Sequence, residues 1–101
     1  MSIIEGLETP AVLLDRVKLE RNLAAMQELA DAQGMALRPH AKTHKSVEIA
    51  RRQVALGASG LTVATVSEAR VFSTAGIGSI TISRPTMGGL ERLASIAQRV
   101  D

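Results

Sequence analysis

The chain has 101 residues, of which 46% are apolar and 22% charged, with no cysteine and a single aromatic residue, Phe72. This is the composition of a globular domain with an aliphatic core, and it excludes disulfides and thiol chemistry. The formal charge of +2 comes from interspersed acids and bases, and no apolar run is long enough for a signal peptide or a membrane span. We therefore expect a cytoplasmic protein that binds neither nucleic acid nor membrane.

The first half of the chain alternates strand-like and helical patterns. Residues 11–14 are a strand candidate, and Asp15 follows as a helix cap. Apolar residues then recur at helical spacing as far as Gly34, which stands where a C-terminal glycine is expected. Residues 36–42 are the second strand candidate, although Pro39 lacks an N–H and is typical of a strand start or edge.

The second half continues the alternation. A helix is predicted from about Ser46 to Gly57, followed by a strand at residues 60–65. Thr65 and Glu68 then match a capping box at the start of a third helix. A strand at residues 79–83, a loop and a last helix from about residue 90 complete the pattern.

This order predicts an α/β fold with parallel strands and crossover helices. One interpretation is an open four-stranded sheet. The other is the beginning of a (β/α)8 TIM barrel, which needs about 250 residues in full. Because 101 residues cannot close a barrel and the pattern stops within a helix, we expect residues 1–101 to be the incomplete N-terminal part of a barrel domain.

The basic run RPHAKTHK contains the candidate site. In a strand, Arg38, His40 and Lys42 share one face, and such a polar face requires a solvent-accessible cavity. Lys42 would lie at the carboxyl end of the strand, where these folds place their chemistry. An amine must be neutral to attack an aldehyde, and neighbouring cations favour the neutral form. A solvated basic turn is the alternative, and strand alternation favours Lys42 over Lys45.

The motifs TPAVLLD, RPHAKTHKS and EIARRQ resemble the D-threonine aldolase and D-serine dehydratase family, over residues 9–83. The resemblance implies an alanine-racemase-like N-terminal barrel of the fold type III pyridoxal phosphate enzymes. It implies that Lys42 carries pyridoxal 5'-phosphate as a Schiff base, with His40 and Arg38 beside the cofactor. It also implies that residues 11–14 form a strand that belongs with a C-terminal β domain.

The same resemblance implies a homodimeric lyase whose small-molecule substrate is a 3-hydroxy or related D-amino acid, cleaved by an aldolase or dehydratase reaction. It implies a divalent metal whose ligands lie outside this chain, and we expect none from His40 and His44. Val63-Ala64-Thr65 stands where many members carry a Cys-Gln-Lys type sequence, and the loop at residues 84–89 also differs. An amino-acid racemase and a non-catalytic pyridoxal phosphate-binding barrel are the alternatives.

Overall fold

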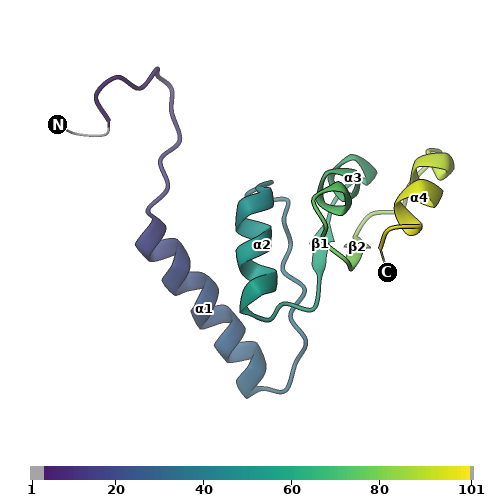
Figure 1. Cartoon of the computed structure of the whole chain (residues 1–101), viewed down its shortest axis with the longest axis horizontal. Helices are drawn as coiled ribbons and strands as arrows, with labels where there is room; N and C mark the ends of the chain where they lie inside the picture. Colours follow the sequence, from purple (N-terminus) through teal and green to yellow (C-terminus); the bar gives the residue numbers. More distant parts are fainter. Residues whose placement is uncertain (1–3, 101) are drawn as a thin grey trace.

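The structure is a computed structural model, and it describes residues 4–100. Within that range the chain forms α1 (Arg16–Ala32), α2 (Val47–Leu56), β1 (Leu61–Val63), α3 (Val66–Thr74), β2 (Ile80–Ile82) and α4 (Leu90–Ala97). Figure 1 shows these elements spread out in chain order, with the segment before α1 extending away from the rest. The radius of gyration is 15.8 Å, against about 13 Å for a compact domain of 100 residues.

The starts of three helices are fixed by the side chains that the sequence indicates. Asp15, Ser46 and Thr65 are the N-caps of α1, α2 and α3, and each accepts a hydrogen bond from the backbone N–H three residues later. These bonds satisfy N–H groups that have no partner inside the helix. Gly34 follows α1 with φ +65°, and Gly57 caps α2 with φ +123°, as expected for glycines that end helices.

The two strands are parallel and α3 crosses between them. Leu61 is paired with Ile80 and Val63 with Ile82. Residues 37–41 run beside β1 on its other edge, because the Thr62 N–H donates to the Pro39 carbonyl and the Ala41 N–H donates to the Thr62 carbonyl. The predicted α/β class with parallel strands and crossover helices is therefore confirmed.

The predicted strand at residues 36–42 is wrong in its extent. Only His40 forms a β-bridge, with Thr62, and a turn occupies residues 41–44. Pro39 has no N–H to donate to a ladder, and the pairing stops at Ala41. Lys42 consequently lies in the turn that follows the extended segment, where strand alternation no longer determines the direction of a side chain.

The predicted strand at residues 11–14 is also absent from the structure. These residues have no regular secondary structure, and Val12, Leu13 and Leu14 are exposed. A strand needs a neighbour that accepts its backbone hydrogen bonds, and none of the bonds found within residues 4–100 supplies one. Apolar character alone therefore did not make this segment a strand.

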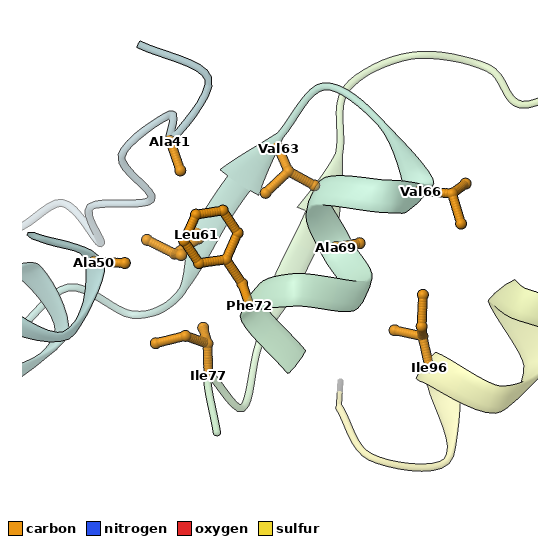
Figure 2. Close-up of a cluster of buried hydrophobic side chains, with 9 residues drawn as sticks. All are labelled: Ala41, Ala50, Leu61, Val63, Val66, Ala69, Phe72, Ile77 and Ile96. Atoms are coloured by element: carbon orange, nitrogen blue, oxygen red, sulfur yellow. The ribbon is translucent and has the colours of Figure 1, made fainter. Parts of the chain in front are cut away.

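The core lies between the sheet and the helices. Leu61 and Val63 of β1 have no exposed surface, and Phe72 of α3 is 1% exposed. Figure 2 shows Phe72 beside Leu61, with Ile77 and Ala50 around them, while Ile96 of α4 lies toward Ala69. Strand alternation puts Thr62 and Thr81 on the opposite face of the sheet. The sheet therefore has an apolar face covered by helices and a polar face on which the site lies. Within the described residues, no helix is long and apolar enough to cross a membrane.

Candidate functional site

Arg38 reaches from the extended segment across β1 to β2. Its guanidinium donates to the hydroxyl of Ser79, and its Nη1 donates to Thr81 Oγ1 over 3.4 Å. The backbone carbonyl of Arg38 accepts from Thr62 Oγ1 over 3.1 Å. Arg38 therefore ties three parallel segments together on the polar face.

Gly60 makes this crossing possible. A Cβ at position 60 would lie 2.7 Å from Arg38 Nη1 and 2.5 Å from the carbonyl oxygen of Ser79. Both separations are shorter than a carbon atom tolerates, and the second involves backbone that cannot swing away. The missing side chain at Gly60 thus provides the space in which the guanidinium lies.

His40 links the turn of Lys42 to the end of β2. Its Nδ1 accepts the Lys42 backbone N–H over 3.2 Å, and its Nε2 lies 3.3 Å from Ser83 Oγ. The Ser83 hydroxyl donates to the Val63 carbonyl over 3.1 Å. Each donor meets an acceptor when the proton is on Nε2. Arg38 and His40 are thus brought together on the polar face, as alternation predicts.

Lys42 has a fixed backbone and a free amine. Its N–H is held by His40, the preceding Ala41 is fully buried, and the Lys45 N–H closes the turn on the Ala41 carbonyl over 2.8 Å. The Lys42 side chain is exposed, and within residues 4–100 neither a hydrogen bond nor an ion pair engages its ammonium group. Lys42 therefore offers an accessible amine on an anchored turn.

Lys45 is in a different situation. Its Nζ lies 3.7 Å from Oε1 of Glu68, whose side chain is 10% exposed. Oε2 of Glu68 accepts from the Thr65 hydroxyl over 2.8 Å. Burial alone would raise the pKa of the Glu68 carboxyl, but the hydrogen bond from Thr65 and the charge of Lys45 outweigh it and lower that pKa. Glu68 is thus an ionised partner for Lys45 as well as the predicted helix cap.

His44 is engaged at both ring nitrogens. Nδ1 accepts the Ser46 N–H over 2.9 Å, and Nε2 lies 3.2 Å from Gln53 Oε1. Partial burial disfavours the charged ring and lowers the His44 pKa, although the bond to Gln53 acts in the opposite direction. These contacts give His44 a structural role before α2. Across residues 4–100 no group of three or more His, Cys, Asp or Glu side chains is arranged to hold a metal.

A hollow of about 270 Å³ lies at the carboxyl ends of β1 and β2, beside the start of α3. Its lining includes Arg84, Gly88, Gly89 and Arg92, but not Lys42. Gly89 begins α4 with φ +69° and without a side-chain cap. The loop after β2 therefore lies at the strand ends, the edge of the sheet where α/β folds place ligands.

Residues 14–100 match the family described as alanine racemase, N-terminal domain. The chain belongs to this family.

Proteins similar to this chain carry the names of enzymes of D-amino acid metabolism. The chain is 48% identical to a D-threonine aldolase of Arthrobacter sp over 93% of its own length and 27% of the relative's. It is 53% identical to the D-threo-3-hydroxyaspartate dehydratase of Delftia sp. over 73% of its length and 20% of the relative's. The crystal structure of the Filomicrobium marinum D-threonine aldolase superposes with a TM-score of 0.89 at 47% identity, covering 92% of this chain and 26% of that one. The chain therefore spans about a quarter of the length of these relatives.

Some residues of the site carry no local signal in the sequence. Ser83 lies at the end of a predicted strand, but its bond to His40 joins residues 43 positions apart. The spacing of Thr65 and Glu68 identified the cap, whereas the pairing of Glu68 with Lys45 depends on how α3 packs. The position of Gly60 at the start of a predicted strand was the one available sign of a close backbone approach.

Proposed function

We propose that this family member is the N-terminal part of a pyridoxal-phosphate-dependent lyase acting on 3-hydroxy D-amino acids, and that Lys42 holds the cofactor. The observation that carries the proposal is the contrast between the two lysines of one turn. The amine of Lys42 is accessible and has no described partner, whereas that of Lys45 faces a carboxylate. The names of the relatives support the substrate class, since D-threonine and D-threo-3-hydroxyaspartate both carry a hydroxyl on C3.

The residues present fit pyridoxal phosphate. Covalent attachment to an aldehyde needs a primary amine that is reachable and not held in an ion pair, which describes Lys42. We further propose that Arg38 and His40 line the cofactor site. Their bonds to Ser79, Thr81 and Ser83 hold them in fixed orientations, which favours a preorganised site.

The bound cofactor would supply an electron sink for the charge that develops on the substrate Cα. The part of this chain is to hold and orient: Lys42 provides the attachment, and His40 fixes the backbone from which Lys42 extends. A divalent metal bound by residues outside this chain stays a prediction. It is supported by a solved structure of a D-threo-3-hydroxyaspartate dehydratase variant that is described as being in the metal-free form. The homodimer and the cytoplasmic location also stay predictions.

Aldolase and dehydratase are both represented among the relatives. An aldolase breaks the bond between Cα and Cβ, whereas a dehydratase removes water across the same two carbons. A racemase is less favoured, because the relatives at 48% and 53% identity are named as an aldolase and a dehydratase. The cleaved bond would be decided by groups outside this chain.

The attachment is tested by borohydride reduction of the full-length protein with pyridoxal phosphate, followed by peptide mapping. The label is expected on Lys42, and labelling of Lys45 alone, or no label, would contradict the proposal. Incubation with D-threonine and D-threo-3-hydroxyaspartate, with metal supplied, separates the two reactions. Acetaldehyde and glycine from D-threonine indicate an aldolase, whereas oxaloacetate and ammonia from the second substrate indicate a dehydratase.

A further inference from the structure

Two lysines of the same turn compete for one role. Lys42 and Lys45 both have exposed side chains and stand three residues apart: Lys42 lies within the turn, and the backbone N–H of Lys45 donates the hydrogen bond that closes it. Both are primary amines on flexible four-carbon stems. Chemical type therefore does not distinguish them, and the distinction must come from their surroundings.

The carboxylate of Glu68 provides the difference. Its side chain is 10% exposed, and Oε1 has no hydrogen-bond partner within the described residues. The charged group that faces it is the ammonium of Lys45, 3.7 Å away. A shielded carboxylate without a counter-charge is unfavourable, so the position of Glu68 favours the arrangement in which the Lys45 ammonium lies beside it.

The backbone of Lys45 favours the same arrangement. Its φ is +52°, and it is the single non-glycine residue with a positive φ among residues 4–100. A residue with a Cβ rarely adopts this conformation and holds it when surrounding contacts compensate. The closing bond to Ala41 and the pairing with Glu68 are the contacts that the structure provides.

We propose that Glu68 is a positioning residue that selects between the two lysines: by holding the ammonium of Lys45, it leaves Lys42 as the amine that takes the cofactor. This inference rests on the proposed function, because it concerns the attachment of an aldehyde cofactor. It assigns to a helix-capping carboxylate the task of keeping a neighbouring lysine out of the site.

The first test needs no variant and no cofactor. The full-length protein is treated with limiting acetic anhydride, and acetylation is compared at Lys42, Lys45 and Lys18, an exposed lysine of α1 whose ammonium has no described partner. Lys45 is expected to react about two- to fivefold more slowly than Lys18, the range that a partly exposed ion pair supports. Equal rates at Lys45 and Lys18 would overturn the proposal.

The second test uses Glu68→Gln, which keeps the size of the side chain and removes its charge. Acetylation of Lys45 should rise to the rate of Lys18. Borohydride labelling with pyridoxal phosphate should then divide between Lys42 and Lys45, whereas the wild type is labelled on Lys42. If Lys45 is still acetylated more slowly than Lys18 in this variant, or still takes no pyridoxal phosphate label, Glu68 does not select between the lysines.

Two matched variants separate selection from general disturbance. Glu48→Gln removes an exposed carboxylate of α2 that pairs with Arg52, and it should leave the label on Lys42. Lys45→Arg keeps the pair and removes the competing amine, so its label should also stay on Lys42, even when combined with Glu68→Gln. A wild type without any label would instead refute the proposed function, while the acetylation comparison would still decide whether Glu68 holds Lys45.

Discussion

Nδ1 of His40 accepts the backbone N–H of Lys42 over 3.2 Å, while Nε2 of the same ring reaches Ser83 Oγ at 3.3 Å. One imidazole therefore connects the turn that carries the candidate lysine to the end of β2. The two nitrogens can be tested separately, because amide side chains reproduce one or the other.

Replacing His40 by glutamine should loosen the turn of Lys42. A glutamine amide can take the place of Nε2 and still donate to Ser83, but it offers no acceptor to the Lys42 N–H. His40→Asn does the reverse, since its Oδ1 can take the place of Nδ1. Each lost bond should lower the free energy of unfolding by about 1 kcal/mol, and His40→Gln should slow covalent attachment of pyridoxal phosphate more than His40→Asn. Equal attachment rates would argue against anchoring through Nδ1.

Adding a methyl group at position 60 should disrupt the polar face. Gly60→Ala brings a Cβ into the carbonyl oxygen of Ser79 and the guanidinium of Arg38, and overpacking of this kind costs about 1–3 kcal/mol. Gly78→Ala is the matched control, because its Cβ would meet no atom within 4 Å. Urea unfolding of the two full-length variants should give a lower midpoint for Gly60→Ala alone, and equal midpoints would refute the close approach.

Acidification should destabilise the protein through His44. The His44 pKa is lowered in the folded state, whereas the unfolded chain keeps the ordinary value of 6.5. The unfolded chain therefore binds more protons in this range, so the free energy of unfolding decreases as the pH falls below 6.5. His44→Asn keeps an acceptor for the Ser46 N–H but does not titrate.

Urea midpoints measured from about pH 8 to about pH 5.5 should accordingly fall more steeply for the wild type than for His44→Asn. His40 is present in both proteins, so it does not contribute to the difference between their pH profiles. The lowered pKa of Glu68 changes the free energy of unfolding only below pH 4.5, the ordinary pKa of a glutamate, which lies outside this range. Parallel pH profiles for the two proteins would show that His44 is not protected from protonation.

Truncating the one aromatic side chain should be the most damaging core change. Phe72 is 1% exposed and lies beside Leu61 and Ile77 (Figure 2). Phe72→Ala should lower the free energy of unfolding by about 3–5 kcal/mol. Val71→Ala on the same helix removes a side chain that is 52% exposed and should cost about 0.5 kcal/mol or less. Denaturant unfolding of the two full-length variants, followed by circular dichroism, measures both losses, and similar losses would contradict the packing described.

Local chemistry made most of the helices predictable. Asp15 and Thr65 are short polar side chains placed just before apolar periodicity, and each caps the helix that the sequence indicates. Gly34 and Gly57 adopt the positive φ that a helix end favours. The strands at residues 60–65 and 79–83 were also located correctly, although the structure shortens both.

Pairing across the chain was not predictable in the same way. The extended segment ends at Ala41 because pairing with β1 stops there, and the sequence of the segment alone does not show where β1 can pair. Residues 11–14 would form a strand only beside a neighbouring strand, and residues 4–100 do not provide one. The contact between Lys45 and Glu68 likewise arises from packing of α3 against the sheet. Periodicity describes one segment at a time, whereas these features belong to pairs of segments.

The hydroxyl-rich face of the sheet constrains whatever packs against it. The hydroxyls of Ser79 and Thr81 accept from the guanidinium of Arg38, and Ser83 Oγ lies beside the ring of His40. Thr62 Oγ1 donates to the Arg38 carbonyl. A dry aliphatic layer laid over these groups would remove the water on which their remaining donors and acceptors depend. Any surface that packs against this face must therefore be hydrophilic or hydrated.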